Sequence, residues 1–350
     1  MKFIKGAALC LALLVVTLFV ACSSSKETKT LGLEEAVGTA IDAYLYGYPL
    51  ITFDIARQQQ TNVAVPDAEH APMGQMIRMR TYPAVDNHCC AAPNADTLYT
   101  EAWLDVSKEP SVLSIPDMGN RYYIIPILDG YSEVFSVASP ATTGYKAQTY
   151  AITGPGWTGR LPPGVTQVKS ATGMVWVLGR IYCTGTPEDY TAVHALQDKF
   201  SIVPLGSYGK PYTPPPGQVD SNFDMKTAVR KQVDALDIDA YFTRLAQLMK
   251  TNPPTAGDAP LVARMASIGL IPGQDYDPSK LGVFDREAIK AVPKLALVKM
   301  VKLLKEQKTT NYQLLETQLL QQGRHRKQTT VGGEILAAEE AGFQIGRAHV

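Results

Sequence analysis

Short runs of alternating apolar and polar residues, separated by turn residues, fill the middle of the sequence and constrain its fold most. Glycine and proline clusters separate these runs, and no helical pattern intervenes. Alternation of this kind predicts half-buried strands, and strands without helices between them pair antiparallel. The pattern therefore predicts an antiparallel β-sandwich or jelly roll. The expected strands are Ser111–Ile115, Arg121–Leu128, Glu133–Ala138, Lys146–Ile152, Val165–Val168 and Met174–Cys183.

The segment Pro116–Asn120 lies between the first two of these runs and ends in Gly119 and Asn120. A short glycine-containing connection between two strand patterns is typical of a β-hairpin. We therefore expect Ser111–Ile115 and Arg121–Leu128 to pair with each other.

The stretch from Pro93 to Val106 joins a turn to a strand with two different faces. Asn94 and Asp96 can each bond a backbone amide just ahead, which favours a turn before the strand begins at Thr97. Alternation then separates an aliphatic face from an aromatic and acidic face. The aliphatic face holds Leu98, Ala102, Leu104 and Val106, and the other face holds Thr97, Tyr99, Glu101, Trp103 and Asp105.

Helical patterns precede and follow the strands. An apolar stripe from Leu33 to Tyr48 predicts a helix that Pro49 ends or kinks. Thr186 begins a capping box that opens a helix through Phe200. The fold class is therefore α+β: an antiparallel sandwich or jelly-roll-like domain, preceded by a helix and followed by a helical connector. In the connector, Leu295, Val298, Val301 and Leu304 are expected to point inward.

These patterns divide the chain into six parts. They are a signal peptide (1–22), a linker (23–30), the β-domain (31–210), a proline-rich linker (211–236), the helical connector (237–308) and a truncated or artefactual tail (309–350). A truncated connector is expected to leave an apolar face uncovered.

The first residues predict export and a lipid anchor. Lys2 and Lys5 precede an apolar run, and Ala21 stands directly before Cys22. This arrangement resembles a bacterial lipobox, in which the cysteine thiol is lipidated and becomes the mature N-terminus. Ser23 favours sorting to the outer membrane. The chain is thus expected to be a periplasmic protein of the cell envelope, bound to outer-membrane lipid through Cys22 and labelled by palmitate.

Charge and cysteine content narrow the partners. The chain has 33 basic and 33 acidic residues, so no global field attracts nucleic acid, and we expect none as a partner. Cys183 could pair with Cys89 or Cys90, and the sequence leaves the pairing open. Adjacent cysteines beside His88 converge poorly on one ion, so neither a metal nor another cofactor is expected.

No sequence signature of a serine hydrolase, zincin, Walker loop or dinucleotide fold is present. What remains is a group of carboxylates close to aromatic residues, a combination that glycan sites use. We therefore take Asp96 and Glu101 as candidate catalytic residues. The candidate ligand-binding residues are Asn94, Asp96, Tyr99, Glu101, Trp103 and Arg121.

Several local motifs carry a family resemblance. They are Ala43–Pro49, Pro93–Tyr99, Ala102–Asp105, Arg121–Tyr123, Gly154–Gly159 and Leu178–Arg180. With them, the chain resembles the domain-of-unknown-function 1254 family from about Glu34 to Lys210. The resemblance implies an envelope-associated β-fold without an established catalytic set. A second domain of that architecture, the domain of unknown function 1214, is expected to be absent or scrambled here after about Lys308.

Three functions fit these observations. The leading expectation is an envelope lipoprotein that binds a small molecule or glycan through its β-sandwich. The alternatives are a cell-envelope glycan hydrolase that uses a carboxylate pair, and a purely structural or assembly lipoprotein. The sequence does not decide whether the protein is an enzyme.

Overall fold

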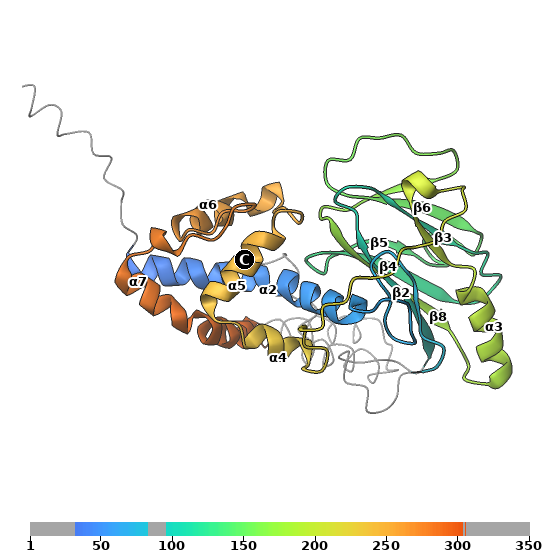
Figure 1. Ribbon diagram of the computed structural model, residues 1–350, viewed down its shortest axis with the longest axis horizontal. Coiled ribbons are helices and arrows are strands. Elements are labelled where there is room, and N and C mark those ends of the chain that lie inside the picture. Colours follow the sequence, from blue (N-terminus) through green and yellow to red (C-terminus); the bar gives the residue numbers. More distant parts are fainter. Residues whose placement is uncertain (1–31, 83–95, 304, 306–350) are drawn as a thin grey trace, which may run out of the picture. The chain divides into compact units, whose positions relative to one another are not determined.

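The computed structural model describes residues 32–82, 96–303 and 305. The described residues from Leu33 onward belong to one compact unit. Its described α-helices are α2 (Leu33–Thr61), α3 (Pro187–Gln197), α4 (Val229–Asp234), α5 (Ile238–Leu248), α6 (Ala259–Ser267) and α7 (Val283–Ala288) (Figure 1). Short 3-10 turns occupy Leu205–Ser207, Ala256–Asp258, Pro278–Lys280 and Ile289–Ala291, and residues 292–303 are helical.

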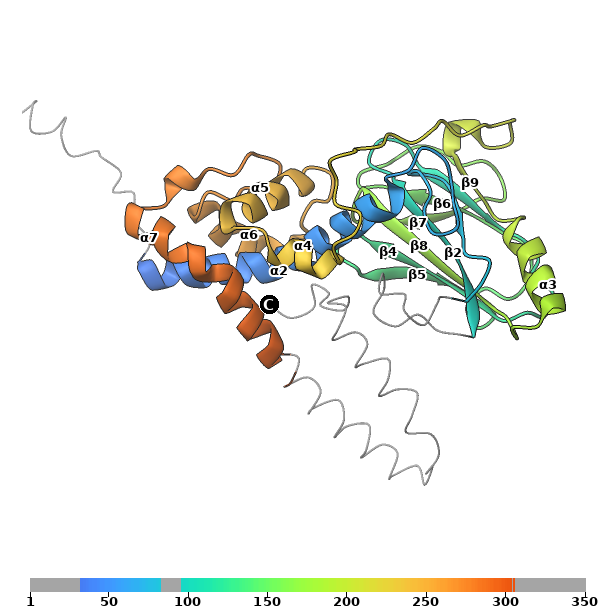
Figure 2. The same cartoon turned by 60° about the horizontal axis from the view of Figure 1, so that its bottom comes forward.

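The strands form two sheets (Figure 2). One has the order β1 (Ile77–Arg78), β2 (Thr97–Asp105), β8 (Met174–Tyr182), β4 (Tyr123–Asp129) and β5 (Val134–Ala138). The other has the order β7 (Thr166–Lys169), β6 (Gln148–Thr153), β3 (Ser111–Ile115) and β9 (Ser201–Pro204). All pairs are antiparallel except β6 with β7, which is parallel.

The aliphatic face of β2 lies in the main hydrophobic core, as the alternation predicts. Leu98, Ala102 and Leu104 pack in one cluster with residues of both sheets. The other members from the two sheets include Val175, Val177, Ile181, Leu113, Ile115, Ile152 and Ile202. The α+β class with antiparallel sheets, a leading helix and following helices is thus confirmed, whereas a jelly-roll connectivity stays a prediction.

The predicted hairpin at Pro116–Asn120 is wrong. β3 belongs to the four-stranded sheet, where it pairs with β6 and β9, whereas β4 pairs with β5 and β8 in the five-stranded sheet. The connection therefore crosses from one sheet to the other. A glycine-containing turn fixes a local change of direction, but partner choice depends on which core face each strand covers.

α2 continues through Pro49, which the sequence predicts to end or kink the helix. Every residue from 43 to 56 is buried. α2 packs against α4, α5, α6 and α7, so tertiary packing outweighs the hydrogen bond that a mid-helix proline removes. A Cβ atom at Gly47 would lie 2.5 Å from a Leu245 methyl carbon, so the glycine permits the close approach of α5.

The helix over residues 292–303 is rotated relative to its predicted orientation. Val292, Ala296 and Met300 are buried, whereas Leu295, Val298 and Val301 are exposed. Lys299 Nζ donates to Asp42 on α2 at 2.8 Å, which fixes the face turned toward α2. Leu304 lies outside the described residues. Val283 and Phe284 of α7 are exposed as well, and the uncovered apolar face expected of a truncated connector stays a prediction.

Within the described part of the chain, no helix combines the length and apolar character needed to cross a bilayer.

Candidate functional site

The second face of the five-stranded sheet brings together most of the candidate residues on β2. Three facing pairs define it: Tyr99 with Arg180, Glu101 with Leu178, and Trp103 with Trp176. We call these six residues the Trp103 face. All except Arg180 are buried, and Glu101 is only 3% exposed although it is a carboxylate. Because facing side chains on paired strands stand side by side, this face places one acid and one base close together.

One end of the Trp103 face lies against α2. The indoles of Trp103 and Trp176 stack with their centroids 5.1 Å apart, and Phe53 of α2 meets both of them edge-on. Trp103 Nε1 also donates to Gln60 Oε1 on α2 at 2.5 Å. The Trp103 side chain is therefore only 1% exposed. The sequence predicts that it contacts a ligand, but in the structure it contacts α2.

The other end of the face is formed by Tyr99, Glu101 and Arg180. The guanidinium carbon of Arg180 lies 5.6 Å from the centroid of the Tyr99 ring, a cation–π arrangement. Arg180 Nε is buried and has no hydrogen-bond acceptor among the residues that the structure describes. Glu101 is the diagonal neighbour of Arg180, at a backbone separation of about 7–8 Å. This end combines an aromatic ring, a carboxylate and an unsatisfied cationic donor.

Arg180 was not among the predicted site residues. It is the charged residue of the otherwise apolar run Met174–Cys183, and only its pairing with Tyr99 across the sheet reveals its relation to the candidate residues. Arg180 could have been identified from the sequence only by predicting the pairing register of β2 and β8.

The structure does not bring the two candidate catalytic carboxylates together. Asp96 is exposed and precedes β2, where its carbonyl accepts from the Cys183 amide at 3.0 Å. Five residues of extended chain between Asp96 and Glu101 correspond to roughly 16 Å. A glycosidase pair needs a separation of about 5–9.5 Å. Asn94, Cys22, Cys89 and Cys90 lie outside the described residues, and Cys183 is buried.

Arg121 precedes β4, and its side chain binds Asp189 in the first turn of α3. Its Nη2 and Nη1 donate to the two Asp189 carboxylate oxygens at 2.5 and 3.0 Å, and Nη1 also donates to the Tyr182 carbonyl. The Arg121 guanidinium, together with the Thr184 amide, holds the pKa of the Asp189 carboxyl well below its usual range. The pair fixes α3 to the sheet, and Arg121 is thereby occupied by an internal partner.

We expect Asp189→Asn to lower the free energy of unfolding by about 2 kcal/mol at neutral pH, because it breaks a largely buried charged bond. A depressed native pKa stabilises the fold above the unfolded-state value, about 3.9, and this stabilisation is lost as the pH falls toward the native value. The difference between wild type and variant should therefore shrink below about pH 4.

Urea denaturation across the pH range checks this expectation. Asp198→Asn is the matched control, because Asp198 pairs with Arg80 while remaining 61% exposed, and its loss should stay below about 1 kcal/mol. Equal losses for both variants, or a difference that persists at low pH, would contradict the role assigned to Asp189.

Arg78 and Arg80 bind the end of α3. Arg78 donates to the carbonyls of Gln197 and Phe200, both at 3.0 Å. Arg80 donates to the His194 carbonyl, and the His194 ring contacts the Arg80 carbonyl in return. Gln197 is fully buried and donates to Tyr99 O and Thr100 Oγ1. These residues have structural roles, and no pattern in the sequence pointed to Gln197.

The described residues contain no group of three or more histidine, cysteine or acidic side chains that could hold a metal ion.

Comparisons with known proteins give a family match for part of the chain and a likeness in fold. Residues 73–204 match the family described as "Protein of unknown function (DUF1254)". No curated protein matches the chain. The crystal structure of the VPA0106 protein from Vibrio parahaemolyticus aligns with 77% of this chain, with 24% identity and a TM-score of 0.57. The chain spans 60% of the length of that relative, and the likeness shows the fold.

A second solved structure, of an uncharacterised protein from Burkholderia cenocepacia, aligns with 52% of this chain and 51% of its own. Its identity is 14% and its TM-score is 0.26, values too low to support an argument about either fold or function.

Proposed function

We propose that this chain, in which residues 73–204 belong to the DUF1254 family, binds a small molecule or glycan on the Trp103 face of its five-stranded sheet. The observation that carries the proposal is the Arg180 end of that face. A half-buried guanidinium lies there over the Tyr99 ring, and its Nε lacks an acceptor within the described structure. Leaving a buried donor unsatisfied is costly, so the site favours a ligand that supplies oxygen atoms.

The chemistry of this end favours a polyhydroxylated or acidic ligand. Arginine can donate to two oxygen atoms of a carboxylate or of neighbouring hydroxyls at once. Glu101 supplies an acceptor for ligand hydroxyl groups, and the Tyr99 ring offers an apolar surface beside them. Binding is favoured over hydrolysis because Asp96 lies too far along the chain to act with Glu101 as an acid and base pair.

We propose further that the protein is a lipoprotein of the cell envelope, anchored to the outer membrane through Cys22 and facing the periplasm. The support comes from the sequence: a basic start, an apolar run and the Ala21-Cys22-Ser23 junction. Membrane fractionation with palmitate labelling tests this anchor.

A ligand screen followed by substitution at Arg180 tests the binding proposal. Thermal-shift and glycan-array screens of the protein should identify a ligand that binds without being converted. For that ligand, Arg180→Gln is expected to weaken the affinity by about tenfold or more, because it removes the charge-assisted donor. Glu101→Gln should also weaken binding, by a smaller factor.

Arg160→Gln is the matched control, since Arg160 is exposed and lies outside the sheet. It should bind the ligand as the wild type does. Wild-type affinity in Arg180→Gln would place the site elsewhere. A screen that finds neither binding nor turnover would favour a structural or assembly role.

A further inference from the structure

The helix over residues 292–303 has an exposed face as well as a buried one. It lies near the red end of the colour bar in Figure 2. Val292, Ala296 and Met300 form its buried stripe. Val298 points away from that stripe and is 71% exposed. Its neighbours on the helix surface are the residues three and four positions away.

These neighbours of Val298 are aliphatic at one spacing and basic at the other. Leu295 and Val301, three positions away, are each 45% exposed. Lys294 and Lys302, four positions away, are exposed as well. We call Val298 and these four residues the basic aliphatic face. Exposed aliphatic side chains that lie next to one another, and are not scattered singly, mark an interaction surface.

The segment that carries this face is basic, although the whole chain is neutral with 33 basic and 33 acidic residues. The helix over residues 292–303 contains no acidic residue. From residue 283 to residue 305 the basic side chains are Arg286, Lys290, Lys294, Lys299, Lys302 and Lys305, and the acidic ones are Asp285 and Glu287. The face therefore suits an anionic partner. A second copy of this chain, docked through the same face, would bring like charges together.

Aliphatic residues placed between lysines on one helix surface are typical of helices that lie on a membrane. The aliphatic side chains enter the boundary between headgroups and acyl chains. Lysine stems lie along the apolar zone and carry their ammonium groups to the lipid phosphates. Lys294 and Lys302 stand on either side of Val298 along the helix, as this arrangement requires.

The helix is also attached to the part of α2 that begins nearest to the proposed lipid anchor. Lys299 pairs with Asp42 at 2.8 Å, and Asp42 lies roughly 14 Å along α2 from its start at Leu33. The chain from Cys22 to Leu33 spans at most about 40 Å. An acyl chain on Cys22 would thus hold the face within reach of the bilayer surface. This step rests on the proposed anchor, whereas the charge of the face does not.

We propose that the basic aliphatic face binds the surface of an anionic phospholipid bilayer. Leu295, Val298 and Val301 enter the headgroup boundary, and Lys294 and Lys302 contact lipid phosphates. The face adds a noncovalent contact to the acyl anchor, and an acyl chain combined with a basic patch gives stable membrane attachment.

The test uses the full chain with Cys22→Ser, so that no acyl chain contributes to membrane binding. Hydrogen exchange of the backbone amides over residues 292–303 is measured without lipid, with phosphatidylcholine vesicles and with vesicles that also contain phosphatidylglycerol. Exchange is expected to slow only with the phosphatidylglycerol vesicles, and added salt should reverse the effect because it screens the charges. The readout is local, so binding through the N-terminal apolar run does not imitate it.

Two variants of the face test the roles of its residues. Val298→Glu should lower the affinity for phosphatidylglycerol vesicles, relative to phosphatidylcholine vesicles, by about tenfold or more, because it places an acid where the helix meets lipid. Lys294→Gln should lower the same ratio by about fivefold, the contribution of one lysine at an anionic surface. Both side chains are exposed, so both variants should keep the wild-type melting temperature.

Val219→Glu and Lys199→Gln are the matched controls. Val219 is 56% exposed in the segment that precedes α4, and Lys199 is exposed just after α3. Both variants should keep the wild-type vesicle affinities and hydrogen exchange. Exchange over residues 292–303 that is the same under all three conditions would overturn the proposal. An equal loss of affinity in Val219→Glu and Val298→Glu would overturn it too, because net charge alone would then explain binding.

Sedimentation equilibrium without lipid tests a second copy as the occupant of the face. A dimer that Val298→Glu dissociates, together with unchanged exchange on vesicles, would assign the face to self-association and overturn the proposal. Palmitate labelling is measured on the chain with Cys22 intact, so failure of the anchor and failure of the face are distinguishable.

Discussion

Trp103→Ala is expected to lower the free energy of unfolding by about 3–5 kcal/mol, the range for truncating a fully buried tryptophan. The side chain is 1% exposed, stacks on Trp176 and meets Phe53 edge-on. Its removal would leave a cavity between β2 and α2 and would leave the Gln60 side chain without its indole donor. Urea denaturation monitored by circular dichroism measures the loss.

The matched control is Trp157→Ala. Trp157 is part-exposed and packs over Gly159 in the connection between β6 and β7, so its loss should cost less than about 2 kcal/mol. The comparison also decides what Trp103 does. If Trp103→Ala kept wild-type stability and lost the ligand identified by the screen, Trp103 would be a ligand platform and its contact with α2 would contribute little.

Local periodicity predicted the strand β2 well. Both faces of β2 follow from alternation, because every second side chain of an extended chain points to the same side. The strand Ser111–Ile115 is confirmed at both ends. Thr186 caps α3 as its sequence predicts, with its side chain accepting from the Asp189 amide. These features depend on residues close together in the chain.

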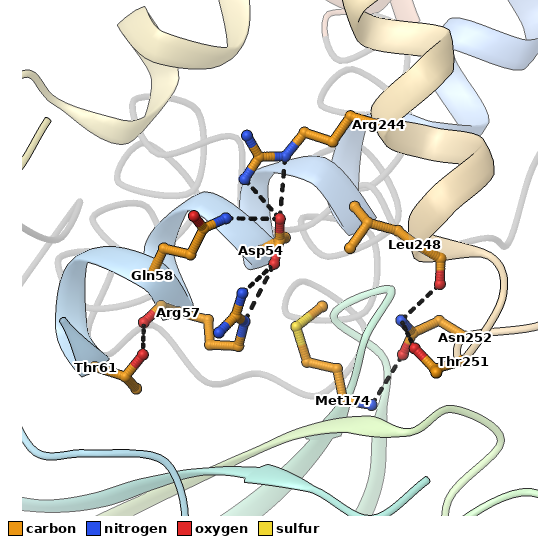
Figure 3. Close-up of polar contacts among 9 residues, drawn as sticks. All are labelled: Asp54, Arg57, Gln58, Thr61, Met174, Arg244, Leu248, Thr251 and Asn252. Atoms are coloured by element: carbon orange, nitrogen blue, oxygen red, sulfur yellow. Dashed lines mark hydrogen bonds and ion pairs between the residues drawn. The ribbon is translucent and has the colours of Figure 1, made fainter. Parts of the chain in front are cut away.

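Features that depend on distant partners were not predictable in this way. Arg121 pairs with Asp189, which lies 68 residues away, and no local pattern selects that carboxylate among the others. Arg244 on α5 donates to Asp54 on α2, 190 residues away in the chain (Figure 3). The burial of Trp103 under α2 likewise depends on a helix that begins at Leu33, so the strand alone suggested an open aromatic face.

Distant contacts also decide whether a segment without a clear period becomes a strand or helix, and which face of a helix is buried. β9 and α4 lie in segments without a clear period, and only pairing with β3 and packing against α2 give them regular structure. In the helix over residues 292–303, two apolar stripes compete, and the ion pair between Lys299 and Asp42 accompanies burial of the stripe that contains Val292 and Met300.

Cys22→Ser is expected to abolish palmitate labelling and to remove the protein from the outer-membrane fraction. Serine lacks the thiol that accepts the lipid, so the modification and the sorting that depends on it should both be lost. An acyl chain contributes about 0.8 kcal/mol of membrane affinity for each buried CH₂ group, and stable anchoring takes more than one chain. Cell fractionation with radiolabelled palmitate measures both effects in one experiment.

Cys10→Ser is the matched control, because Cys10 lies within the apolar run and not at the Ala21-Cys22 junction. Labelling and outer-membrane location should be unchanged in this variant, which excludes a general effect of losing a thiol from the segment. A Cys22→Ser protein that still carries palmitate and still sediments with the outer membrane would show that the lipobox interpretation is wrong. Anchoring would then require another residue, and the proposed ligand site would remain to be tested separately through Arg180.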